Sequence, residues 1–121
     1  MGIWLIKISV IYLFIGTALG MYMAITGDYG MSSVHTHISL LGWTTMTLAG
    51  LIYHIFPMLA RSILCKIVFI LLNIGVPIMM IGLIYPEYVV IVSVGATITS
   101  IAILIFTVHI LTGLKRVPEE E

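Results

Sequence analysis

The sequence predicts an all-α membrane protein with four transmembrane helices in an up-and-down arrangement. Hydrophobic residues make up 61% of its 121 positions, and charged residues make up only 8%. A soluble domain of this size has too little interior to bury so much apolar surface. One bilayer crossing needs roughly 20 consecutive apolar residues, so four crossings use most of the chain and leave no separate soluble domain.

Four apolar stretches run between the turn signals and charged residues. We place the crossings at about Ile3–Thr26, Ser33–Pro57, Ile63–Tyr85 and Glu87–Thr112, followed by a tail over residues 113–121. All of residues 1–121 then form one transmembrane domain. No basic segment or small-residue cleavage site accompanies the first stretch, so we expect a retained helix rather than a signal peptide.

Glycine spacing, a turn and a capping residue support the first two predicted helices. Gly16 and Gly20 form a GxxxG motif, which lets membrane helices approach closely and is expected to serve packing within one bundle. The loop at residues 27–30 has the composition of a turn. Ser32 or Ser33 is then expected to cap the second helix.

Prolines mark the third and fourth elements. Pro77, close to Gly75, predicts a kink in the third helix. Pro86 is expected to begin the fourth helix, because proline fits the first helical position.

Charged residues fall at the helix ends, and the two signs separate. Asp28 and Glu87 lie in the two turns on one side of the predicted bundle. On the other side lie all of the basic residues: Lys7, Arg61, Lys66, Lys115 and Arg116. The positive-inside rule then predicts a cell inner (cytoplasmic) membrane protein with both termini in the cytoplasm.

Composition also excludes several classes of function. The formal net charge is zero and no basic patch stands out, so nucleic acid is not an expected partner. Cys65 is the only cysteine, which excludes an intrachain disulfide and a multi-cysteine metal site. The lipid bilayer is the one partner that composition itself requires.

His35 and His37 are the strongest candidates for a functional site. An ionisable side chain inside a membrane segment is a functional-site hypothesis by default, and imidazole is the commonest metal ligand, including for haem iron. A helix turns about 100° per residue, so residues i and i+2 point about 200° apart. The two imidazoles cannot bind one iron together: either one is structural, or the helix serves two sites.

The other two histidines, His54 and His109, fall near the basic ends of the second and fourth helices. There an imidazole can reach headgroup water. We expect structural or interfacial roles for both, with a quinone or proton site as the alternative.

The second helix resembles one helix of subunit I of the haem–copper oxidases, the family of cytochrome c oxidase and nitric oxide reductase. The shared features, in similar order and spacing, are His35, His37, Gly50, Tyr53, Phe56 and Pro57. The family's catalytic subunit contains twelve helices in three four-helix arcs. Because this chain has the size of one arc, the resemblance implies a homotrimer that rebuilds the twelve-helix core.

The resemblance also implies a cofactor. In the family the two histidines of this motif bind two different haems. Carried onto this chain, His37 of one subunit and His35 of the next would bind one haem b at each interface, for electron transfer or for redox or gas sensing. Trp43 and Tyr53 lie on the same helix and could stack near the porphyrin edge, although an aromatic residue in such a helix more often serves packing. Ser39 or Thr36 would support an imidazole. A redox partner or a quinone would exchange electrons with the haem.

Two departures from the family keep other functions open. The copper-binding His-Pro-Glu-Val-Tyr and His-His stretches do not occur, so a complete oxidase is not expected and enzyme activity stays open. No Lys or Arg lies on the outer side to bind haem propionates, which leaves Tyr29, Ser32, Ser33 or backbone N–H groups. The alternative function is a non-haem structural or assembly subunit of a respiratory complex.

Overall fold

The computed structural model describes residues 2–114, and residues 1 and 115–121 lie outside the described part. The elements in chain order are α1 (Gly2–Thr26), α2 (Ser32–His37), the π-helix η1 (Ile38–Thr45), α3 (Met46–Ile55), α4 (Pro57–Ala60), α5 (Ile63–Ile84) and α6 (Val89–Gly113). Four stretches are long and apolar enough to cross a membrane: Gly2–Thr26, Ser32–Ile55, Ile63–Ile84 and Val89–Gly113. The predicted all-helical, four-crossing fold is confirmed for this part of the chain.

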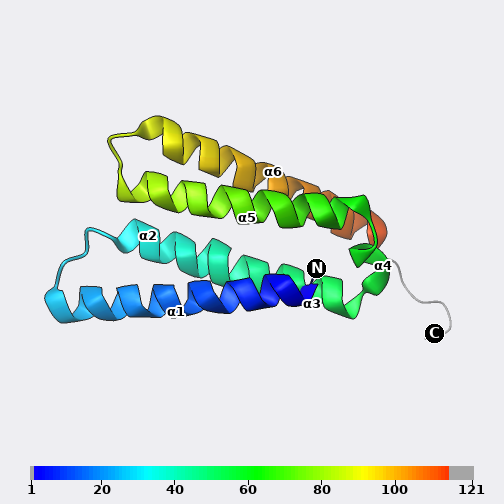
Figure 1. The fold of residues 1–121 in the computed structure, drawn as a ribbon, viewed down its shortest axis with the longest axis horizontal. Coiled ribbons are helices and arrows are strands. Elements are labelled where there is room, and N and C mark those ends of the chain that lie inside the picture. The colour runs from blue at the N-terminus through cyan, green and yellow to red at the C-terminus, as the bar shows by residue number, and fades with distance from the viewer. Residues whose placement is uncertain (1, 115–121) are drawn as a thin grey trace.

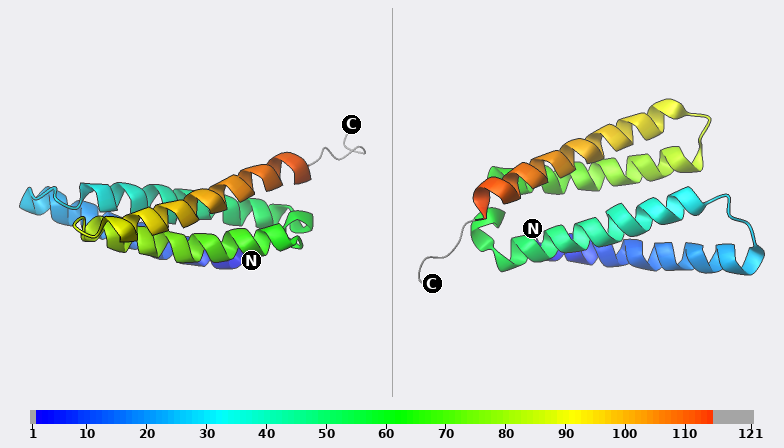
Figure 2. Two further views of the ribbon diagram at one scale, coloured as in Figure 1. Left: turned by 90° about the horizontal axis from the view of Figure 1, so that it is seen from above. Right: turned by 180° about the vertical axis from the view of Figure 1, so that it is seen from behind.

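The helices form two hairpins that lie side by side (Figure 1). In the first hairpin α1 packs along α2, η1 and α3, and in the second α5 packs along α6. The two hairpins meet where α2 and η1 contact α5, and where α4 contacts α5 and α6. In the view of Figure 1 and from behind in Figure 2, α1 and α6 lie at opposite edges.

The described basic and acidic residues lie at opposite ends of the helices. The start of α1, the short helix α4, the start of α5 and the end of α6 gather at one end (Figure 1). We call this the basic end, because it carries the described basic residues Lys7, Arg61 and Lys66. The opposite, acidic end holds the turns with Asp28 and Glu87. This confirms the predicted separation for residues 2–114, whereas Lys115 and Arg116 lie outside them.

Glycines bring the helices of the first hairpin into close contact. A Cβ atom on Gly16 would lie 3.2 Å from Ser39 Oγ, and one on Gly20 would lie 3.0 Å from His35 Cε1. One on Gly50 would lie 2.8 Å from the Gly2 carbonyl oxygen. The GxxxG motif therefore serves packing within this chain, as the sequence predicts.

The second hairpin is packed more tightly still. A Cβ atom on Gly75 would lie 2.6 Å from Thr99 Oγ1. On Gly82 and on Gly95 it would overlap the backbone of the opposite helix. Van der Waals contact between backbones is a main source of helix association in lipid, so these glycines hold α5 against α6.

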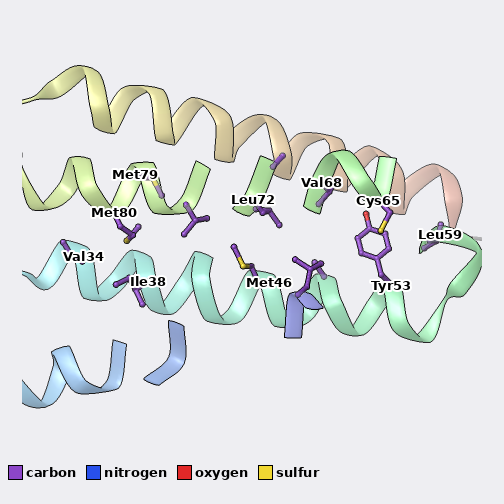
Figure 3. Close-up of a cluster of buried hydrophobic side chains, with 14 residues drawn as sticks. Val34, Ile38, Met46, Tyr53, Leu59, Cys65, Val68, Leu72, Met79 and Met80 are labelled. Carbon is purple, nitrogen blue, oxygen red and sulfur yellow. The ribbon is translucent and has the colours of Figure 1, made fainter. Parts of the chain in front are cut away.

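A buried apolar cluster fills the space between the hairpins (Figure 3). Its members include Val34, Ile38, Met46 and Tyr53 from the first hairpin and Val68, Leu72, Val76, Met79 and Met80 from the second. The helices at the edges are less covered by the rest of the protein. In the apolar stretch of α1 and in that of α6, 17% of the residues are buried, against 39% in α5. Their apolar outer faces suit contact with lipid or with another membrane helix.

Two predicted helix ends are wrong by a few residues, and proline explains both. The second crossing ends at Ile55 rather than Pro57, because Phe56 (φ −114°, ψ 79°) precedes a proline and leaves the helical region. Pro57 begins α4 instead. Pro86 does not begin the fourth crossing: it lies in a turn closed by Tyr88 N–H donating to the Tyr85 carbonyl, and α6 starts at Val89.

The predicted serine cap on the second helix is also wrong. Met31 occupies the N-cap of α2 without a side-chain hydrogen bond, and Ser32 Oγ donates to the Tyr29 carbonyl at 2.6 Å. A serine cap does occur on α5, where Ser62 Oγ accepts from Leu64 N–H. Pro77 lies inside α5, which continues to Ile84, and the kink there stays a prediction.

Candidate functional site

His35 and His37 lie in α2, near the acidic end of the molecule. Directly after His37 the helix widens into η1, an eight-residue π-helix. In the wider turns Thr44 Oγ1 and Thr45 Oγ1 donate to carbonyls five residues earlier. Departures from α-helical geometry of this kind occur frequently at functional sites.

His35 is held against α1. Its Nδ1 atom lies 2.8 Å from the carbonyl oxygen of Gly16. Its ring also lies beside Gly20, whose missing side chain leaves the space that the imidazole occupies. The GxxxG motif of α1 thus forms the surface on which this half-buried imidazole rests.

His37 is held within its own helix. Its Nδ1 atom lies 2.8 Å from the carbonyl oxygen of Ser33, one turn earlier. His37 is also half-buried. The two imidazoles therefore have separate supports, one in α1 and one in α2.

Both hydrogen bonds favour one tautomer. A carbonyl oxygen only accepts, so Nδ1 must carry the proton and Nε2 keeps its lone pair. Histidines that bind metals almost always donate their other ring N–H to a carboxylate, a backbone carbonyl or water. Backbone carbonyls fill this role here, so the prediction that Thr36 or Ser39 supports an imidazole is wrong. Ser39 Oγ instead lies towards α1, near Gly16.

The two aromatic candidates on this helix, Trp43 and Tyr53, lie at different distances from the histidines. Trp43 is half-buried in η1, in the same half of the helix as the two histidines. Tyr53 lies 16 positions after His37, about four helical turns further along the helix. Tyr53 packs against Phe106 and His109, which agrees with the packing role expected for an aromatic residue of this helix.

Tyr53 belongs to a second polar cluster, near the basic end. Its hydroxyl oxygen lies 3.0 Å from Nδ1 of His109, and its ring meets Phe106 edge-on. His109 is only 4% exposed and pairs with Tyr53, so of the two expected roles, structural or interfacial, it takes the structural one. His54 is exposed. Tyr53 and His109 lie near the ends of helices that finish on the same side, which is the sequence signal that pairs them.

No acidic or thiol side chain of the described residues joins the histidines in a cluster that could bind a metal ion. Within residues 2–114 there is no group of three or more His, Cys, Asp or Glu side chains placed to hold a metal ion. A haem bound by two imidazoles needs no such group, and each chain offers two imidazoles with different supports. The fit to haem thus rests on the ring nitrogens of His35 and His37.

Fold and charge distribution define the class of protein: an all-helical, multi-pass membrane protein whose described basic residues share one end. No family model, no curated protein and no solved structure matches the chain.

Proposed function

We propose that this chain is an integral-membrane haem b protein in which each iron is bound by His37 of one subunit and His35 of the next. The observation that carries the proposal is the support of the two imidazoles. Each donates Nδ1–H to a backbone carbonyl, which leaves Nε2 free to bind iron. Two histidine ligands leave no open position on the iron, which favours electron transfer over gas binding.

The proposed assembly is a homotrimer. The hairpins lie side by side with α1 and α6 at opposite edges (Figure 1), and these two helices are the least covered of the four. A cyclic arrangement covers both edges with three equivalent interfaces. Copies of His35 and His37 would then meet between neighbouring subunits.

Bound haem would supply one-electron chemistry. The chain's own residues would bind and orient it. The carbonyls of Gly16 and Ser33 would hold the imidazoles, and Trp43 would pack beside the ring. A redox partner or a quinone would complete the path of the electron.

Haem content tests the proposal. Protein purified in detergent should show sharp α and Soret bands on reduction and one haem per chain. His35→Ala or His37→Ala should each empty every site, because each site takes one ligand of each kind. His54→Ala, at the opposite end, should keep full haem content. Full haem content in both α2 variants, or no haem bands in the unaltered protein, would overturn the proposal.

Mixed assemblies give a sharper test. When His35→Ala and His37→Ala chains are produced together, a mixed trimer has one interface that pairs an intact His37 with an intact His35. Random mixing in a cyclic trimer should restore about a quarter of the haem sites. Two ligands from one chain would predict no restoration.

The second candidate function is a non-haem structural or assembly subunit of a respiratory complex. The charge distribution favours it. Among residues 2–114 the cations Lys7, Arg61 and Lys66 lie at the end away from His35, and the Ser32 hydroxyl already donates to a carbonyl. No described cation is therefore near α2 to bind haem propionates. Isolation without iron, and only together with other subunits, would favour this function.

A further inference from the structure

The basic end contains a cavity that plays no part in the proposed haem site. It has a volume of about 510 Å³ and lies between the first turn of α1 and the junction of α3 with α4. Its lining residues are Gly2, Ile3, Trp4, Tyr53, His54, Pro57 and Ala60. Figure 1 shows the start of the described chain beside α3 and α4 at this end.

Close backbone contact holds the start of α1 against the end of α3 beside this cavity. A Cβ atom on Gly2 would lie 2.5 Å from the carbonyl oxygen of Gly50 and 2.9 Å from the backbone nitrogen of His54. The start of α1 and the end of α3 therefore cannot approach further. Binding cavities of this size are usually largely formed before the ligand arrives.

The cavity wall includes the first residues of a long helix. Gly2, Ile3 and Trp4 line it, and they begin the 25-residue helix α1. The first N–H groups of a helix lack partners within the helix, and this end carries the positive part of the helix dipole. The positive part of this dipole therefore lies at the cavity wall.

The charged side chains near the cavity are also positive. Lys7 Nζ lies 5.1 Å from the ring centroid of Trp4, a lining residue. Arg61 is exposed and directly follows Ala60, another lining residue. Within residues 2–114 the acidic side chains are Asp28 and Glu87, both at the opposite end. The described part of the chain thus places no carboxylate near the cavity.

We infer that this cavity binds the headgroup of an anionic phospholipid. The phosphate would take the donors at the start of α1 and the charges of Lys7 and Arg61, and the apolar walls would contact the glycerol and upper acyl chains. Basic pockets between membrane helices bind anionic headgroups in this way. A neutral quinone would use the aromatic wall but would gain nothing from the cations. The inference does not depend on haem, because the cavity and His37 lie in opposite halves of the molecule.

Lipid-dependent stability tests the inference on the full chain in detergent. We expect phosphatidylglycerol to raise the melting temperature, and phosphatidylcholine with the same acyl chains to leave it unchanged. Lys7→Gln and Arg61→Gln should each weaken phosphatidylglycerol binding about fivefold, the value of one cation near a lipid surface. Lys66→Gln is the matched control: Lys7 lies over the lining residue Trp4 and Arg61 directly follows the lining residue Ala60, whereas the exposed Lys66 lies on α5, which contributes no lining residue. Native mass spectrometry should show one retained phosphatidylglycerol per chain.

Four outcomes would overturn the inference. Equal stabilisation by phosphatidylcholine would remove the role of the charge. An equal loss in Lys66→Gln would show general attraction to a basic surface rather than this cavity. Displacement of phosphatidylglycerol by a neutral quinone that itself survives Lys7→Gln and Arg61→Gln would assign the cavity to quinone. Equally tight binding of glycerol phosphate would assign it to a soluble phosphate. None of these outcomes bears on haem content, so failure here is distinct from failure of the proposed function.

Discussion

The hydroxyl of Tyr53 lies 3.0 Å from Nδ1 of His109, which places a hydrogen bond between the two hairpins inside their buried interface. Tyr53 is 1% exposed and His109 is 4% exposed. Within residues 2–114 this is the one side-chain hydrogen bond that joins the first hairpin to the second. The buried cluster beside this bond is apolar, so the bond adds a directional contact to an interface otherwise held by packing.

Tyr53→Phe should therefore lower stability. The substitution keeps the ring and its contact with Phe106 but leaves the Nδ1 atom of His109 without a partner. A buried unpaired polar group costs about 1–3 kcal/mol in proteins, and hydrogen bonds within membranes fall at the low end, about 0.6–1.7 kcal/mol. Unfolding in mixed detergent micelles measures the loss. Thr107→Val is the control, since that exposed hydroxyl donates only to its own helix, and an equal loss in both would contradict the pairing.

Gly95→Ala should open the second hairpin. The added methyl would overlap the backbone of Met79, which cannot move aside as a side chain can. Overpacking of this kind costs about 1–3 kcal/mol or more. Gly113→Ala is the matched control, because its methyl would meet Leu59 Cδ2, the far end of a flexible side chain, at 2.5 Å. Melting temperatures should fall clearly for Gly95→Ala and little for Gly113→Ala, and the reverse order would contradict the backbone contact.

If the proposed haem site is correct, Gly20→Val should reduce haem content without altering either proposed ligand. A Cβ atom there already lies 3.0 Å from His35 Cε1, and two further methyl groups would push the imidazole away from the Gly16 carbonyl. Loss of such a supporting contact typically weakens metal binding about 10–100-fold. Ala24→Val, one turn later on the exposed side of α1, should keep full haem content. Equal haem content in both variants would indicate that His35 is not an iron ligand.

Ser9 and Thr47 should prove energetically coupled. Thr47 Oγ1 donates to Ser9 Oγ at 2.8 Å, and Ser9 Oγ in turn donates to the Ile6 carbonyl. A double-mutant cycle of Ser9→Ala and Thr47→Val should give a coupling energy of about 0.6 kcal/mol, the average for such bonds in membranes. Ser9→Ala combined with Thr112→Val, an exposed site on α6, should instead be additive.

Length and hydropathy were enough to predict the helices. Four apolar stretches and one-sided basic residues gave the number of crossings and their alternation. The errors lie where local chemistry competes: Ser32 satisfies a loop carbonyl rather than capping α2, and Pro86 closes a turn rather than opening α6. The π-helix Ile38–Thr45 was not predicted, because hydropathy does not distinguish a π-helix from an α-helix.

The candidate site was predictable only in part. Helical spacing predicted that His35 and His37 point to different sides, but not what holds them. Backbone carbonyls do so, and every residue has one, so no residue type in the sequence marks Gly16 or Ser33 for that role. The pairing of Tyr53 with His109 spans 56 positions and depends on how the two hairpins align. That alignment follows from side-chain contacts in the buried cluster between the hairpins, which composition does not reveal.

An even number of crossings has a consequence for how such a chain can change. Gly2 begins α1 and Gly113 ends α6 at the same end of the molecule (Figure 1). Copies placed around a ring would therefore each begin on the membrane side where the previous one finishes. Duplication of the coding sequence with a short connecting segment would join neighbouring copies into one polypeptide without adding a crossing or inverting any copy. Once joined, each copy would be free to lose or gain histidines on its own.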